Sequence, residues 1–160
     1  MTTTVSMKTP IGVLQIEGDD EVITLVTLPG KDDKPLPATP KGPPPAAVSK
    51  AVEQLEEYFA GERTEFDLPL DLDGTTFQKE VWSTLADIPY GKTISYAELA
   101  SMVGRPTAYR AVGQANGANP IPIILPCHRV LARGGRIGGY GGGLAMKRQL
   151  LALEGITGVD

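Results

Sequence analysis

The chain has 160 residues, which is enough for one hydrophobic core or two small lobes and too few for several independent domains. Hydrophobic residues make up 41% and charged residues 21%, which excludes a wholly disordered or collagen-like chain. One cysteine and one histidine cannot form an internal disulfide or a Cys/His zinc site, so we expect no metal. No apolar run approaches the roughly 18 to 20 residues that span a bilayer. We therefore expect a cytoplasmic protein without membrane contacts.

Charge is divided unevenly along the chain. Residues 1–74 hold 6 Lys/Arg against 14 Asp/Glu, whereas residues 75–157 hold 9 against 4. The net charge of -4, taken alone, argues against nucleic-acid binding through bulk charge. The split leaves two interpretations open, a basic working lobe beside an acidic one or ordinary solvated faces of opposite sign.

The first half of the chain predicts a small sheet followed by a helix. Apolar and polar residues alternate over 4–28, with a turn signal at Gly18-Asp19-Asp20, which predicts an antiparallel meander. Residues 29–45 are rich in proline and charge and predict a mobile loop. Helical spacing over 46–60 predicts a helix, and 62–74 predicts a connection between lobes.

The second half predicts short helices. One apolar face runs over 75–88, which predicts a helix. Ser95 and Glu98 have the spacing of a capping box, in which each side chain accepts the other's backbone NH, at the start of a helix to Val103. Pro106 is placed to open a further helix, after a glycine-containing turn. The pattern is that of a helix-turn-helix, although any small helical hairpin gives a similar signal.

Two sites in this half could carry function. Arg110 lies among small residues that would let a helix approach a partner closely, although an isolated arginine is more often simply solvated. The run 119–130 leads to the only thiol, Cys127, next to the only imidazole, His128, and the glycine-rich stretch 138–143 follows. From these residues alone, an inert buried cysteine and a nucleophile both remain open.

Pro126-Cys127-His128-Arg129-Val130 resembles the active-site signature of the O6-alkylguanine-DNA alkyltransferases, the methylated-DNA--protein-cysteine methyltransferases. Further blocks resemble the family in order and spacing, namely Ser95-Tyr96, Arg110 to Gly113, Asn119-Pro120, Gly139-Tyr140 and Leu151 to Gly155. The resemblance implies an α+β fold. We expect a ribonuclease H-like lobe over 1–74, with its small antiparallel sheet and helix, and a mostly helical, winged-helix-like lobe with the active site over 75–160.

The resemblance implies a single-turnover transfer of an alkyl group, with methyl as the expected group, from O6-alkylguanine in DNA, and it implies O4-alkylthymine as a second candidate substrate. Cys127 is implied as the acceptor, His128 as its base through a bridging water, Glu154 as the carboxylate that orients His128, and Tyr96 as the proton donor to the leaving guanine. A free thiol has a pKa of about 8.5, so a base is needed to form thiolate at neutral pH. No cofactor motif is evident, and the thioether product is a poor leaving group.

The implied partner is double-stranded DNA carrying alkylated guanine, bound through its minor groove by a protein that is monomeric when free. Arg110 resembles the side chain that fills the stack vacated by the extruded base. Other implied DNA contacts are Tyr96, Ala97, Arg105, Tyr109, Ala111 and Arg133. The implied base pocket comprises Asn119, Val130, Tyr140 and Gly141. Tyr109 departs from the family, which usually has a small residue there.

Two alternative functions belong to other classes of protein. One is a DNA-lesion binding protein of the alkyltransferase-like type, which replaces the cysteine, so the presence of Cys127 argues against it. The other is a thiol hydrolase that uses Cys127 and His128 over many turnovers and needs no finger arginine.

Overall fold

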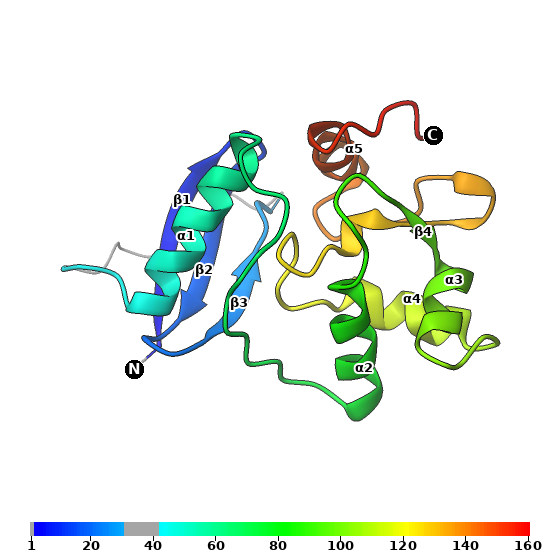
Figure 1. The fold of residues 1–160 in the computed structure, drawn as a ribbon, viewed down its shortest axis with the longest axis horizontal. Coiled ribbons are helices and arrows are strands. Elements are labelled where there is room, and N and C mark those ends of the chain that lie inside the picture. The colour runs from blue at the N-terminus through cyan, green and yellow to red at the C-terminus, as the bar shows by residue number, and fades with distance from the viewer. Residues whose placement is uncertain (1, 31–41) are drawn as a thin grey trace. The chain divides into compact units, whose positions relative to one another are not determined.

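The computed structural model describes residues 2–30 and 42–160. Contacts divide the chain into two compact units, Met1–Leu72 and Asp73–Asp160. The predicted α+β class is confirmed, because an antiparallel sheet and a helix form the first unit and helices dominate the second (Figure 1). Most of the loop predicted for 29–45 lies outside the described residues, since 31–41 are not among them. Within the described residues, no helix is long and apolar enough to cross a membrane.

The first unit begins with the predicted meander. Its three strands are antiparallel neighbours in the order β1 (Thr3–Thr9), β2 (Gly12–Gly18) and β3 (Ile23–Thr27). Alternation along β2 buries Leu14 and Ile16 completely, because side chains two residues apart point to the same face of a strand.

Helix α1 (Ala46–Phe59) packs against the sheet (Figure 1). Val48, Ala51, Leu55 and Tyr58 are fully buried at spacings of three and four residues, so they form one stripe along the helix. The helix ends at Phe59, one residue before the predicted end, and Ala60 caps it.

The second unit contains α2 (Thr76–Leu85), β4 (Ile94–Ser95), α3 (Tyr96–Met102), α4 (Tyr109–Gly117), β5 (Val130–Leu131) and α5 (Leu144–Leu153). Helices α3 and α4 form the predicted helix-turn-helix (Figure 1). The Trp82 indole of α2 donates to the Ala115 carbonyl of α4 (2.7 Å), which fixes these helices together in the core. Strands β4 and β5 pair in parallel through Ile94 and Val130, bringing the start of α3 to the end of the cysteine motif.

Three local predictions need correction. Helix α2 ends at Leu85 rather than at residue 88, because the next residues tighten into hydrogen bonds three residues apart ahead of Pro89. Helix α4 begins at Tyr109 rather than at Pro106, because Ala108 (φ −91°, ψ 30°) closes a turn and is not yet helical.

The third correction concerns the capping box. The Ser95 hydroxyl accepts from the Glu98 amide (3.0 Å) as predicted. The Glu98 carboxylate, however, accepts from the Ser95 hydroxyl (3.3 Å) instead of the Ser95 amide. A reciprocal box is present at α2, between Thr75 and Gln78.

Candidate active site

The only thiol lies in a tight turn. Pro126 (φ −79°, ψ 66°) is the centre of an inverse γ-turn in which the Cys127 amide donates to the Leu125 carbonyl (2.8 Å). A single 3-10 turn, Cys127–Arg129, follows. The backbone at this point is therefore irregular. It frees the side chains of Cys127 and His128 from the opposite orientations that a strand would impose.

Asn119 holds the loop that leads into this turn. Its Oδ1 accepts from the Ile121 amide (3.0 Å) and its Nδ2 donates to the Leu125 carbonyl (2.8 Å). Between these two residues Ile123 has φ 73°, a left-handed conformation that is costly for a β-branched residue. The Asn119 side chain also interacts with the Cys127 thiol and partly opposes the rise in its pKa that burial causes. The loop and the Asn119 side-chain amide together help to position the Cys127 sulfur.

A buried carboxylate links the imidazole to a guanidinium. Glu154 Oε2 lies 2.6 Å from His128 Nε2, and Glu154 Oε1 accepts from Arg129 Nε (2.7 Å). Arg129 makes a second bond to Oε2 (3.2 Å) and donates through Nη1 to the Ile88 carbonyl (2.6 Å). The Gly91 amide donates to Glu154 as well (3.1 Å). This network joins the segments after α2 and α5 to the cysteine turn.

The network determines which nitrogen of His128 can accept a proton. His128 is fully buried, and burial lowers the pKa of its imidazole despite the neighbouring Glu154 carboxylate. In the neutral ring Nε2 carries the hydrogen and donates to Glu154. Nδ1 has no hydrogen-bond partner among the described residues. A lone pair is therefore available on a buried base.

Burial disfavours the Cys127 thiolate. The side chain is 6% exposed, and burial raises the pKa of the thiol to about 11. Asn119 and the charge of Lys147 oppose this shift. Unassisted thiolate is therefore rare at neutral pH, and efficient reaction needs a base.

Two tyrosines interact electrostatically with Cys127. Burial raises the pKa of Tyr96, at the start of α3, and of Tyr140, in the glycine-rich loop. The Tyr96 hydroxyl interacts with the Gly139 backbone and the Asn116 side chain. The Tyr140 hydroxyl is buried and has no hydrogen-bond partner among the described residues. Of these two hydroxyl groups, Tyr96 is engaged by its neighbours and Tyr140 is not.

The remaining sequence-predicted residues divide by exposure. Val130 is fully buried, Asn119 is half-buried and Gly141 is exposed. Among the candidate DNA contacts, Tyr96 is half-buried and the others are exposed. The exposed residues lie on α3, in the turn after it, at the start of α4 and in the 3-10 turn Arg133–Gly135, and they are Ala97, Arg105, Tyr109, Arg110, Ala111 and Arg133. Tyr109 is 50% exposed, so its ring is available to a partner.

Sequence reasoning assigned no role to three buried polar residues of this site. Arg129 pairs with Glu154, and the Asn116 side chain donates to the Cys127 carbonyl (3.5 Å). Lys147 is fully buried in α5. The spacing of Lys147 from Leu150 and Leu151 could have revealed it, because residues three and four apart share a helix face.

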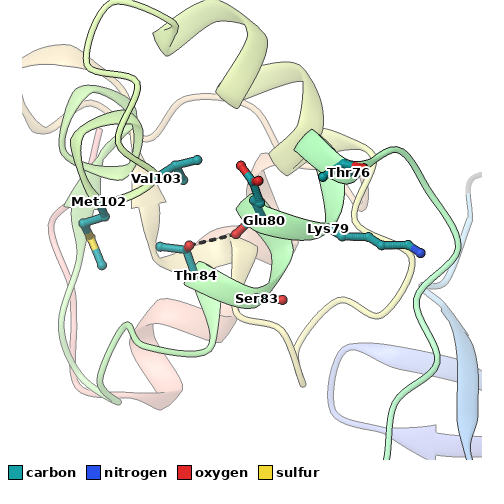
Figure 2. A pocket seen from close by; sticks show the side chains of 7 residues that line it. All are labelled: Thr76, Lys79, Glu80, Ser83, Thr84, Met102 and Val103. Atoms are coloured by element: carbon teal, nitrogen blue, oxygen red, sulfur yellow. Dashed lines mark hydrogen bonds between the residues drawn. The ribbon is translucent and has the colours of Figure 1, made fainter.

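A separate surface pocket of about 570 Å³ is lined by α2 and the end of α3 (Figure 2). Its lining contains Glu80, Thr84 and Met102 but neither Cys127 nor His128. In the described ranges, no group of three or more His, Cys, Asp or Glu could hold a metal ion.

Family models match nearly the whole chain. Residues 76–156 match the DNA binding domain of 6-O-methylguanine DNA methyltransferase, and residues 3–72 match its ribonuclease-like domain. The chain belongs to the 6-O-methylguanine DNA methyltransferase family. The resemblance carried by the Cys127 motif is thereby confirmed.

Other members of the 6-O-methylguanine DNA methyltransferase family are similar over almost their full length. A methylated-DNA--protein-cysteine methyltransferase of Mycobacterium bovis is 52% identical over 149 residues, 93% of this chain and 90% of the relative. The constitutive enzyme of that name from Bacillus subtilis is 43% identical and covers 94% of this chain and 93% of its own. The crystal structure of Mycobacterium tuberculosis OGT in complex with DNA is 51% identical, with a TM-score of 0.82 over 93% of this chain and 90% of that chain.

Proposed function

We propose that this protein repairs DNA by moving the alkyl group of O6-alkylguanine irreversibly onto Cys127. Methyl is the expected group, and O4-alkylthymine is a second candidate substrate. The observation that carries the proposal is the location of the only thiol in a tight turn, next to an imidazole whose Nε2 is engaged by Glu154. Family membership and the DNA complex of a similar protein support it.

His128 acts as the base. Its Nδ1 takes the thiol proton through a bridging water, while Glu154 accepts from Nε2 and stabilises the imidazolium that forms. Arg129 donates to both oxygens of Glu154 and so holds the carboxylate in place. Because the thiol has a pKa of about 11, roughly one molecule in 10⁴ would hold thiolate at pH 7 without this help.

The sulfur then attacks the alkyl carbon. A carbon–sulfur bond forms as the carbon–oxygen bond to guanine breaks, and the Tyr96 hydroxyl donates a proton to the departing base. His128 returns its proton through solvent to Tyr96, so the overall reaction converts a thiol and an alkylguanine into a thioether and guanine. A thioether is a poor leaving group, and each molecule reacts once. The reaction needs no cofactor.

Duplex DNA must release the damaged base into a pocket. We assign the pocket to Tyr140, Asn119 and the backbone of Val130 and Gly141. Exposed Arg110 on α4 fills the vacated stack from the minor groove.

Further DNA contacts come from the exposed residues around the helix-turn-helix. Arg105 and Arg133 contribute positive charge toward phosphates. Tyr96, Ala97, Tyr109 and Ala111 contribute close contacts at the helix starts.

The chemistry is assigned to the lobe over 75–160, with the lobe over 1–74 as its companion. We propose a cytoplasmic location, which fits a DNA substrate. We also propose that the protein is monomeric when it is not bound to DNA.

Intact-protein mass spectrometry tests the function. After incubation with a duplex containing O6-methylguanine, the wild-type protein should gain one methyl group, and Cys127→Ser should gain none. Binding with an unchanged mass would instead support a lesion-binding protein. Repeated release of product would support a thiol hydrolase.

A further inference from the structure

Lys147 is a buried cation that the proposed chemistry does not use. It lies in the first turn of α5, where Met146, Leu150 and Leu151 share its buried face. Its side chain is 0% exposed. Burial of an ammonium group is costly unless hydrogen bonds or an opposite charge compensate for it.

Its hydrogen bonds lead to two walls of the candidate active site. Nζ donates to the Val130 carbonyl (2.7 Å), directly after the cysteine turn, and to the Gly139 carbonyl (3.1 Å), in the glycine-rich loop. Lys147 therefore ties these segments together. An ammonium group has three donors, so one remains beyond these two carbonyls.

No carboxylate of the described residues forms an ion pair with Lys147. Glu154 is engaged by Arg129 and His128. The group that interacts electrostatically with the lysine and can become an anion is the Cys127 thiol.

We propose that Lys147 is a positioning residue for alkyl transfer, whose ammonium group holds the carbonyls of Val130 and Gly139 and acts as counter-ion to the Cys127 thiolate. The inference rests on the proposed function, since it takes Cys127 as the acceptor. The proposal gives the site a cation, Lys147, in addition to the base His128 and the proton donor Tyr96 already assigned.

The charge of Lys147 gives the inference a distinct pH signature. Burial lowers the pKa of Lys147 to about 8, below that of the thiol at about 11. Below pH 8 both groups are mostly protonated, and the small population with thiolate beside ammonium rises about tenfold per pH unit, so reactivity rises with it. Above pH 8, the lysine is mostly neutral. Each further gain in thiolate is then offset by an equal loss of ammonium, so the amount of thiolate–ammonium pair becomes constant.

The other titratable groups that interact electrostatically with these two residues keep their predominant charge between pH 7 and 9.5. His128 on the cysteine turn stays neutral because burial lowers its pKa. Tyr96 on α3 and Tyr140 in the glycine-rich loop stay protonated because burial raises their pKa. Changes in the profile near pH 8 therefore report on Lys147.

Iodoacetamide provides a probe that is independent of DNA repair. Cys127 sulfur displaces iodide and its proton passes to solvent, and because the chain has one cysteine, intact mass follows this adduct. For the wild-type protein we expect the rate to rise up to about pH 8 and then level off. Lys147→Met should slow reaction at pH 7.5 by about tenfold or more, since a nearby opposite charge lowers an acid's pKa by about 1–3 units.

Lys147→Arg supplies the rescue and Lys79→Met the control. A guanidinium keeps its charge, so Lys147→Arg should react faster than Lys147→Met at pH 7.5 and continue to rise to pH 9.5. Lys79 is an exposed lysine of α2, and its replacement should leave the wild-type profile unchanged. If Lys147→Met does not fold, the wild-type profile alone decides.

A wild-type rate that climbs without a break to pH 9.5, absence of reaction at every pH, or a Lys147→Met rate within twofold of wild type would overturn the inference. Failure of the proposed function gives a different result. In that case the methyl group of the damaged duplex is not transferred, while the iodoacetamide profile still levels off near pH 8.

Discussion

Replacing Glu154 with Gln removes the charge that links His128 and Arg129. The Glu154 carboxylate is fully buried and accepts from both side chains and from the Gly91 amide. Gln would leave the buried guanidinium without its counter-ion and would present an amide NH₂ among donors. Breaking a buried pair in this way costs about 3–5 kcal/mol. At about 2–4 °C per kcal/mol for a protein of this size, Tm should fall by about 6–20 °C.

Calorimetric unfolding at pH 7.5 measures this change. Glu80→Gln is the matched control, because the Glu80–Arg105 pair is 3.9 Å apart and half-exposed and should contribute less than about 1 kcal/mol. Methyl transfer by Glu154→Gln should also slow, since His128 loses the group that orients it. A Tm within 2 °C of wild type, or an unchanged transfer rate, would refute the assigned role of Glu154.

Three further predictions test other parts of the structure. Arg110→Ala should slow repair of duplex DNA more than reaction with free O6-methylguanine, and Arg148→Ala should slow neither; equal losses on duplex and free base would argue against extrusion by Arg110. Stability to urea should fall below pH 6.5, by up to about 1.4 kcal/mol at pH 5.5, because the unfolded His128 binds a proton that the buried ring, with its lowered pKa, does not; constant stability would contradict a buried neutral imidazole. Trp82→Phe should cost about 0.5–1.5 kcal/mol in urea unfolding, because the buried Ala115 carbonyl loses the indole donor and keeps only the Ala118 amide, and an unchanged stability would contradict a stabilising role of the indole hydrogen bond.

The order of elements and their types could be predicted from local pattern. Alternation over 4–28 and the apolar spacing over 46–60 predicted the strands and α1, because the periods of strands and helices appear directly in the sequence. Boundaries set by single backbone conformations were predicted less well. Helix α4 begins at Tyr109 because Ala108 closes a turn, and no residue type announces that conformation.

The same limit applies to the site. The sequence by itself determined which reactive groups the site contains, since one thiol adjacent to one imidazole in the 126–130 motif identified the family. Only the tertiary structure decided which charges are buried with them. Arg129, Lys147 and Glu154 could each have been solvated, because their burial depends on what packs around them rather than on their neighbours in sequence.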